Sequence, residues 1–118
     1  MKVSERDFSK SVEDLLKFYG WQFVHFRPAR VMRHGKETYE TAYTGNKGFP
    51  DYFCTKPPRI LIFELKSETG KLSQEQKDWI DLLKSCQQPN MNLYKTCDFP
   101  EVYVWRPDEI ENIAKILQ

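Results

Sequence analysis

The sequence predicts an α/β fold, a sandwich of helices and a mixed central sheet. Three observations support this prediction. Amphipathic helical segments open and close the chain. An apolar run at 60–63 has the composition of a strand buried on both faces, and a third helical segment separates that strand, which extends to residue 66, from another at 102–105. Helices at both ends of a mixed sheet are typical of layered α/β domains. The 118 residues suit one domain covering 1–118.

The first helix is predicted over residues 5–19, where five side chains recur at helical spacing. Ser4 is the expected N-cap, and Gly20 follows the last residue of the pattern. Residues 21–26 alternate and include aromatic and β-branched side chains, which predicts a strand. The stripe on the helix consists of Phe8, Val12, Leu15, Leu16 and Tyr19.

A hairpin is predicted from two strands at 51–55 and 60–66, with Pro57 and Pro58 in the turn between them. A second helix at 73–85, a strand at 102–105 and a helix at 108–117 follow. Two segments lack a clear period. Residues 27–50 are expected to form a loop or a ragged hairpin, and residues 87–100 are expected to be irregular.

Two charged residues, Glu64 and Lys66, end the apolar strand. If residues 56–59 form the turn, the hairpin register places Asp51 opposite Glu64. Facing carboxylates repel, so either one of them holds a proton or a cation lies between them. Lys66 could supply that cation as a salt bridge. A divalent metal is the alternative, since Mg²⁺ prefers one or two carboxylates together with water and phosphate oxygens.

Two further polar residues lie on or beside apolar helix stripes. Gln76 shares the stripe of Trp79, Ile80 and Leu83, and a capping box with Ser73 would satisfy its side chain locally. The same placement would let Gln76 face Asp51 and Glu64, so both interpretations stay open. Glu13 lies at the edge of the first stripe, where spacing favours a solvated side chain paired with Lys17.

Composition limits the function classes. The net charge of +1 does not by itself indicate a polyanionic partner, but residues 27–50 hold five basic side chains against two acidic ones. The three cysteines form no CxxC pair, and the chain has neither a signal-like apolar region nor a run long enough for a membrane span. We therefore expect an intracellular, cytoplasmic protein (in a bacterial or phage-infected cell) with no membrane partner.

At this point three segments resemble a known family. Gly48-Phe49-Pro50-Asp51, Phe63-Glu64-Leu65-Lys66 and Gly70-Lys71-Leu72-Ser73, followed by Gln76 and Trp79, resemble the VRR-NUC domain, the virus-type replication-repair nuclease. This domain is a branch of the PD-(D/E)xK nuclease superfamily. The resemblance covers about residues 8–106. It departs from the family pattern in the basic segment at 27–50 and at 87–100, where members often have a short glycine turn.

The resemblance implies a restriction-endonuclease-like α/β/α sandwich with a mixed central sheet, and a set of site residues. Asp51 and Glu64 would bind Mg²⁺ or Mn²⁺ with the backbone carbonyl of Leu65, and Glu13 is a further candidate ligand. Lys66 would act on the attacking water or the transition state, and Gln76 would position one of them. The residues expected to contact DNA are Arg27, Arg30, Arg33, Lys36, Lys47 and Lys71.

The function that the resemblance implies is a Mg²⁺- or Mn²⁺-dependent endodeoxyribonuclease. Stand-alone members of this branch resemble Holliday junction resolvases, so the expected substrate is branched DNA such as a four-way junction, within DNA repair. The expected assembly is a homodimer. The alternatives are a flap or single-strand nuclease, a nucleic-acid-binding module without catalysis, and a structural protein in which the charged strand end is a salt bridge.

Overall fold

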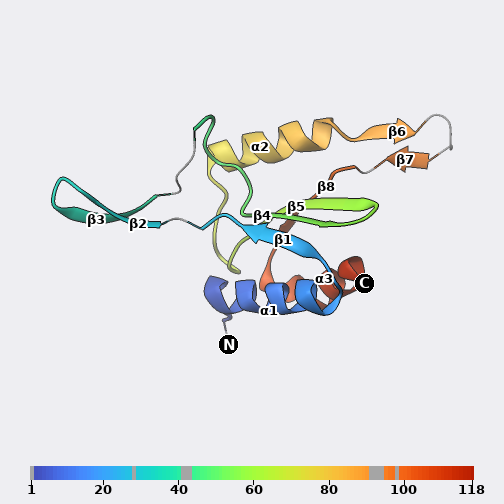
Figure 1. Ribbon diagram of the computed structural model, residues 1–118, viewed down its shortest axis with the longest axis horizontal. Coiled ribbons are helices and arrows are strands. Elements are labelled where there is room, and N and C mark those ends of the chain that lie inside the picture. Colours follow the sequence, from blue (N-terminus) through green and yellow to red (C-terminus); the bar gives the residue numbers. More distant parts are fainter. Residues whose placement is uncertain (1, 28, 41–43, 91–94, 98) are drawn as a thin grey trace.

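The computed structural model describes residues 2–27, 29–40, 44–90, 95–97 and 99–118. Three layers are visible in Figure 1, with helices α1 and α3 on one side of the central sheet and α2 on the other. Two thin ribbons extend from opposite ends of this body, and the molecule measures 58 × 34 × 25 Å. The α/β/α sandwich predicted from sequence is therefore confirmed.

The elements in chain order are α1 (Glu5–Phe18), β1 (Gln22–His25), β2 (Ala29–Arg33), β3 (Lys36–Glu40), β4 (Tyr52–Lys56), β5 (Arg59–Leu65), α2 (Gln74–Ser85), β6 (Gln88–Asn90), β7 (Lys95–Cys97), β8 (Glu101–Trp105), the short 3₁₀ helix η1 (Pro107–Glu109) and α3 (Ile110–Leu117).

The central sheet is mixed and has the strand order β1-β4-β5-β8. Strand β4 pairs antiparallel with both β1 and β5, whereas β5 and β8 run parallel because α2 connects them across the sheet. Thr55 lies opposite Ile60 and Tyr52 lies opposite Phe63. The hairpin register derived from the sequence is therefore confirmed.

Several predicted boundaries need correction. Helix α1 ends at Phe18, and Tyr19 caps it before Gly20, whose φ of +81° is readily adopted by glycine. The segment 87–100 was expected to be irregular, but it contains the antiparallel ribbon of β6 and β7. Pro89 is tolerated there because a two-stranded ribbon consists only of edge strands, which do not need every backbone donor. The second segment without a clear period, 27–50, contains the β2–β3 ribbon, which agrees with the ragged hairpin that was one of its two predicted alternatives.

The main hydrophobic core lies between the sheet and the α1/α3 layer. Alternate residues of β5, Leu61, Phe63 and Leu65, point into it and are fully buried. The ring of Phe63 stacks on Tyr52, with the ring centroids 4.7 Å apart, and packs against Trp105 at 4.6 Å. Helices α1 and α3 contribute Phe8, Val12, Leu16, Ile113 and Leu117 to the same core.

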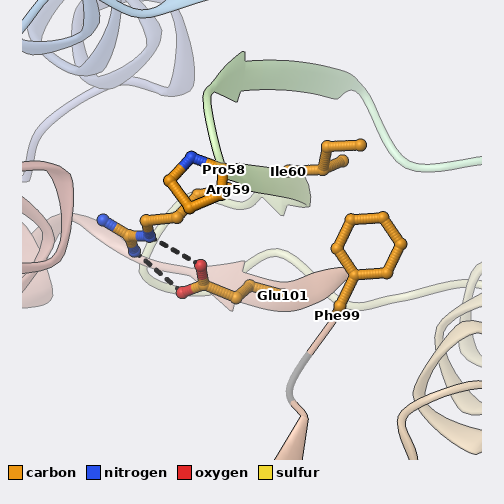
Figure 2. A pocket seen from close by; sticks show the side chains of 5 residues that line it. All are labelled: Pro58, Arg59, Ile60, Phe99 and Glu101. Carbon is orange, nitrogen blue, oxygen red and sulfur yellow. Dashed lines mark hydrogen bonds and ion pairs between the residues drawn. The ribbon is translucent and has the colours of Figure 1, made fainter.

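Arg59 connects the sheet to the C-terminal helix. Its guanidinium donates to both carboxylate oxygens of Glu101 at 2.7 and 2.8 Å, beside a shallow hollow of about 340 Å³ (Figure 2). It also donates to the backbone carbonyl of Ile116 at 2.8 Å and lies 5.1 Å from the ring centroid of Trp21. The Trp21 indole in turn donates to the carbonyl of Leu117 at 2.8 Å. These contacts hold the last turn of α3 against the sheet.

Replacing Arg59 with methionine should destabilise the protein. The change leaves the half-buried carboxylate of Glu101 without its bidentate partner and the Ile116 carbonyl without its donor. We expect a loss of roughly 2–3 kcal/mol in the free energy of unfolding, measured by urea denaturation. Lys115→Met, on an exposed position of α3, is the matched control and should change stability by less than about 0.5 kcal/mol. Equal stability of the two variants would contradict the anchoring role.

Candidate active site

One hollow of about 940 Å³ lies at the end of the central sheet beside α1. The five side chains predicted to act in catalysis or metal binding line it together, although they come from four different parts of the chain. They are Glu13 from α1, Asp51 before β4, Glu64 and Lys66 at the end of β5, and Gln76 from α2. The fold therefore brings the predicted residues together around one hollow.

Asp51 is delivered by a tight loop that closes on α2. Gly48 has a φ of +97°, and a Cβ at this position would lie 2.7 Å from the backbone carbonyl carbon of Glu75, so only glycine allows this approach. The ring of Phe49 meets Trp79 edge-on at 5.1 Å. Asp51 then accepts a hydrogen bond on its backbone carbonyl from the Phe26 amide at 2.8 Å. These contacts fix the backbone position of Asp51, from which its carboxylate projects.

Glu64 is the one buried charged residue in the described part of the chain, with 1% of its surface exposed. Continuing the β4–β5 register by one step beyond the Tyr52–Phe63 pair places it opposite Asp51. Burial, a hydrogen bond with Asp51 and repulsion from the Asp51 charge raise the pKa of Glu64 to about 9. Without a cation, Glu64 is therefore protonated at neutral pH.

The pair of carboxyl groups fits a divalent metal ion. The Oε1 atom of Glu64 is buried without a hydrogen-bond partner among the described residues, which is costly for a polar atom unless a ligand satisfies it. In the described ranges, no three His, Cys, Asp or Glu side chains are grouped to hold a metal. The side chains thus offer two hard oxygen donors, which suits Mg²⁺ because that ion usually keeps several waters and binds one or two carboxylates.

Lys66 lies next to this pair but is not bonded to it. Its backbone amide donates to the Trp105 carbonyl at 3.0 Å, which extends the parallel pairing of β5 and β8 by one residue. Its positive charge opposes the rise in the pKa of Glu64. Among the described residues, no ion pair joins Lys66 to Asp51 or Glu64. The salt-bridge interpretation of the charged strand end therefore finds no support in the geometry.

Gln76 combines the two placements that the sequence left open. Its side-chain oxygen accepts a hydrogen bond from the backbone N–H of Ser73 at 2.9 Å, and the Ser73 hydroxyl accepts one from the backbone N–H of Gln76 at 3.2 Å. This is the predicted capping box. The same side chain lines the hollow that holds Asp51 and Glu64. The cap uses the amide oxygen, so the NH₂ end is the part that can donate to a ligand.

Sequence reasoning missed Arg106, which holds the loop between β5 and α2. Its Nη1 atom donates to the carbonyls of Ser67 and Gly70 at 2.6 and 2.7 Å. The loop carries the chain from Lys66 to Gln76, so Arg106 keeps these two residues on the same side of the hollow. No sequence pattern pairs a residue after β8 with carbonyls near position 70, because the contact depends on the sheet order.

Glu13 is surrounded by donors rather than drawn to the carboxyl pair. Its Oε2 atom accepts from the Tyr52 hydroxyl at 2.6 Å, lies 3.1 Å from His25 Nδ1 and lies 3.8 Å from Arg27 Nη2. Burial, followed by the hydrogen bond to Glu13, raises the pKa of Tyr52. The predicted pairing with Lys17 does not form among the described residues.

His25 also lines the hollow, and the sequence analysis did not select it. Its Nδ1 atom faces Glu13 at 3.1 Å and the Nε of Arg27 at 3.3 Å, so it cannot serve both as donor and as acceptor. We assign the proton to Nδ1, because two acceptors 3.1 Å apart would repel, whereas the exposed Arg27 side chain can adjust. The sequence signal that could have identified His25 is its position two residues after Phe23, which places a polar side chain on the more buried face of β1.

The six residues expected to bind DNA do not form one patch. Arg27 lines the hollow, whereas Arg33 and Lys36 are exposed on the β2–β3 ribbon. Lys47 forms an ion pair with Glu75 at 3.4 Å, and Lys71 is exposed on the loop before α2. The side chain of Arg30 lies outside the described residues. The basic residues are thus spread from the rim of the hollow to the ribbon.

Comparison with known proteins supports the resemblance read from the sequence. The family model described as the VRR-NUC domain matches residues 11–95, a span that includes Glu13, Asp51, Glu64, Lys66 and Gln76. Neither curated proteins nor solved structures gave a match. No helix in the described ranges is long and apolar enough to cross a membrane. The four-stranded mixed sheet with helices on both faces is the restriction-endonuclease-like fold expected from this family.

The raised pKa of Glu64 predicts a pH-dependent stability of the metal-free protein. Native Glu64 keeps its proton up to a pKa of about 9, whereas an ordinary glutamate loses it near 4.5. Between these values the native state binds more protons than the unfolded state, so the free energy of unfolding should fall by up to about 1.4 kcal/mol per pH unit. Urea denaturation with chelator at about pH 5, 7 and 9 measures this slope. Glu64→Gln should flatten this slope, whereas the control Glu68→Gln, on an exposed loop, should leave it unchanged. Equal slopes in the two variants would show that another group causes the pH dependence.

A substitution at Glu13 tests whether this residue is a metal ligand or a positioning residue. Glu13→Gln removes the charge that Tyr52, His25 and Arg27 share, so we expect a loss of roughly 1–2 kcal/mol in stability. Calorimetric titration with Mn²⁺ should give an affinity close to that of the parent. An affinity as poor as that of Asp51→Asn would instead identify Glu13 as a ligand.

Proposed function

The chain belongs to the VRR-NUC family of PD-(D/E)xK nucleases, and from this premise we propose that it is a Mg²⁺- or Mn²⁺-dependent endodeoxyribonuclease acting on branched DNA. Family membership implies a nuclease that binds DNA and typically uses divalent metal ions. The observation that carries the proposal is the Asp51–Glu64 pair. A buried carboxyl group with an unpartnered oxygen, facing a second carboxyl group in an open hollow, has little structural value without a cation.

Asp51 and Glu64 would hold the metal ion, joined by the backbone carbonyl of Leu65. When bound, the ion lowers the pKa of a water ligand and neutralises charge on the scissile phosphate. Glu64 gives up its proton to become a ligand, so affinity for the metal should rise with pH. Burial excludes water from one side of the pair, and the open side faces the hollow where a phosphodiester would enter.

Lys66 is the group proposed to act on the reacting atoms. Its ammonium lies beside the carboxyl pair without forming an ion pair among the described residues, so it remains available to orient the water or to stabilise charge on the phosphate. Gln76 can donate from its NH₂ end while its oxygen stays in the capping box. The helix cap thereby fixes the side chain that would position the water or Lys66.

Branched DNA is the proposed substrate, and a homodimer is the proposed assembly. Each chain offers the Asp51–Glu64 pair, which suits hydrolysis of one strand. Symmetric resolution of a four-way junction needs two equivalent sites, which a twofold dimer supplies. The exposed cations on the β2–β3 ribbon and on the loop at Lys71 extend the surface available to phosphates beyond the hollow.

The carboxyl pair can be tested by matched isosteric variants. Asp51→Asn and Glu64→Gln should abolish cleavage of a labelled four-way junction in Mg²⁺, by at least about a hundredfold, because each removes a metal ligand. DNA binding should be kept or strengthened, since negative charge near the phosphate is lost. Linear, flap and forked DNA are the comparison substrates. Wild-type cleavage by either variant would refute the proposal, and preferred cleavage of the flap would redirect it to a flap nuclease.

Substitutions of Lys66 test whether the charged end of β5 has a catalytic or a structural role. If Lys66 acts on the substrate, Lys66→Met should fold with little loss of stability, bind Mn²⁺ and DNA, and fail to cleave. Lys66→Arg should also cleave poorly, because a guanidinium hardly deprotonates and is bulkier than an ammonium. Thermal melting and cleavage are measured on the same samples. A loss of about 3–5 kcal/mol without metal, with activity restored by arginine, would support a structural salt bridge instead.

A further inference from the structure

The β2–β3 ribbon stands apart from the body of the protein. It forms its own two-stranded sheet and extends away from the central sheet along the long axis of the molecule (Figure 1). An isolated two-stranded hairpin is marginally stable in water. Two large side chains on it, Met32 and Tyr39, are 69% and 68% exposed. Packing against the core therefore does not explain why these side chains are large and apolar.

The turn of the ribbon fixes two cations at its tip. His34 and Gly35 have φ values of +51° and +74°, as in the two-residue type I′ turns that match the twist of a hairpin. This turn places Arg33 directly opposite Lys36. Side chains of directly opposed residues share one face, so the tip of the ribbon presents two basic side chains together. Two neighbouring exposed cations suit contacts with the phosphates of a polyanion.

The opposite face of the ribbon has a different character and leads to the active site. Met32 is opposite Glu37, and Tyr39 is two residues further along the same strand as Glu37, so Met32 and Tyr39 share this face. Tyr39 also lines the hollow that contains Asp51, Glu64 and Lys66. A ligand lying along the ribbon from its tip would therefore reach the carboxyl pair.

The dimensions of the ribbon suit one groove of DNA. Each strand has five residues, which gives a length of about 16 Å at roughly 3.3 Å per residue. The major groove of B-DNA is about 12 Å wide and admits a two-stranded ribbon, whereas the minor groove is only about 6 Å wide. We propose that the β2–β3 ribbon enters the major groove of a duplex arm beside the cleavage site. Arg33 and Lys36 contact phosphates, and the face with Met32 and Tyr39 meets base edges.

This inference rests on the proposed nuclease function and narrows its substrate to DNA with a duplex arm next to the cut. The main test measures binding by fluorescence anisotropy in the Asp51→Asn background, where cleavage does not interfere. Adding Arg33→Gln and Lys36→Gln should weaken binding to a duplex-armed DNA by about tenfold or more, and should reduce the slope of log affinity against log salt by about two. The control adds Lys84→Gln and Lys115→Gln, which remove the same charge from exposed positions on α2 and α3. It should leave both affinity and slope unchanged.

A second measurement identifies the groove. Duplexes whose cytosines carry bulky 5-substituents block the major groove and should weaken binding of the parent, but have little effect on the Arg33→Gln, Lys36→Gln variant. A minor-groove ligand should not compete. Competition by that ligand, or equal affinity for a single strand of the same length, would overturn the inference.

The two proposals can fail separately. If the ribbon variant binds duplex DNA as tightly as its parent, the ribbon inference is wrong and the nuclease proposal stands. If Asp51→Asn or Glu64→Gln cleaves normally in Mg²⁺, the nuclease proposal is wrong whatever the ribbon contacts. Thermal melting of both double variants should match the parent, because all four side chains lie outside the core.

Discussion

The antiparallel register of β4 and β5 is the constraint on which the rest of the site depends. It is held by apolar side chains, since Tyr52 stacks on Phe63 and both are fully buried against α1 and α3. A slip of one residue would turn these rings to the other face of the sheet, at a cost of roughly 1.5–3 kcal/mol for each large side chain exposed. The next pair along the same ladder is Asp51 and Glu64. The hydrophobic core thus fixes the position of two carboxyl groups.

A negative charge on Glu64 is unfavourable at that position, and this favours the binding of a cation. Glu64 is almost fully buried opposite another acid, so without a cation it stays protonated at neutral pH. A divalent ion would replace both the proton and the missing hydrogen-bond partner of Oε1. The surrounding contacts keep this arrangement in place. Gly48 lets the preceding loop close on α2, and Arg106 fixes the loop that follows Lys66.

Core and periphery have different roles in this chain. The sheet and three helices form the part that positions the carboxyl pair, while the two ribbons extend away from that part (Figure 1). The β2–β3 ribbon carries two exposed cations, Arg33 and Lys36, and two exposed large side chains, Met32 and Tyr39, outside the hydrophobic core. A surface of this kind can vary with the substrate without disturbing the register that sets the carboxyl pair.

The sequence by itself determined the layered α/β fold, the β4–β5 register and the family, because each depends on local periodicity, turn composition and short motifs. It also determined the capping box at Ser73 and Gln76, since both partners lie within one helical turn. Only the tertiary structure decided which donors surround Glu13 and which carbonyls bind Arg106, because those contacts join elements that are distant in the chain. The β6–β7 ribbon was also beyond sequence reasoning, and the β2–β3 ribbon was predicted only as one alternative, a ragged hairpin, since neither segment has a periodic apolar face.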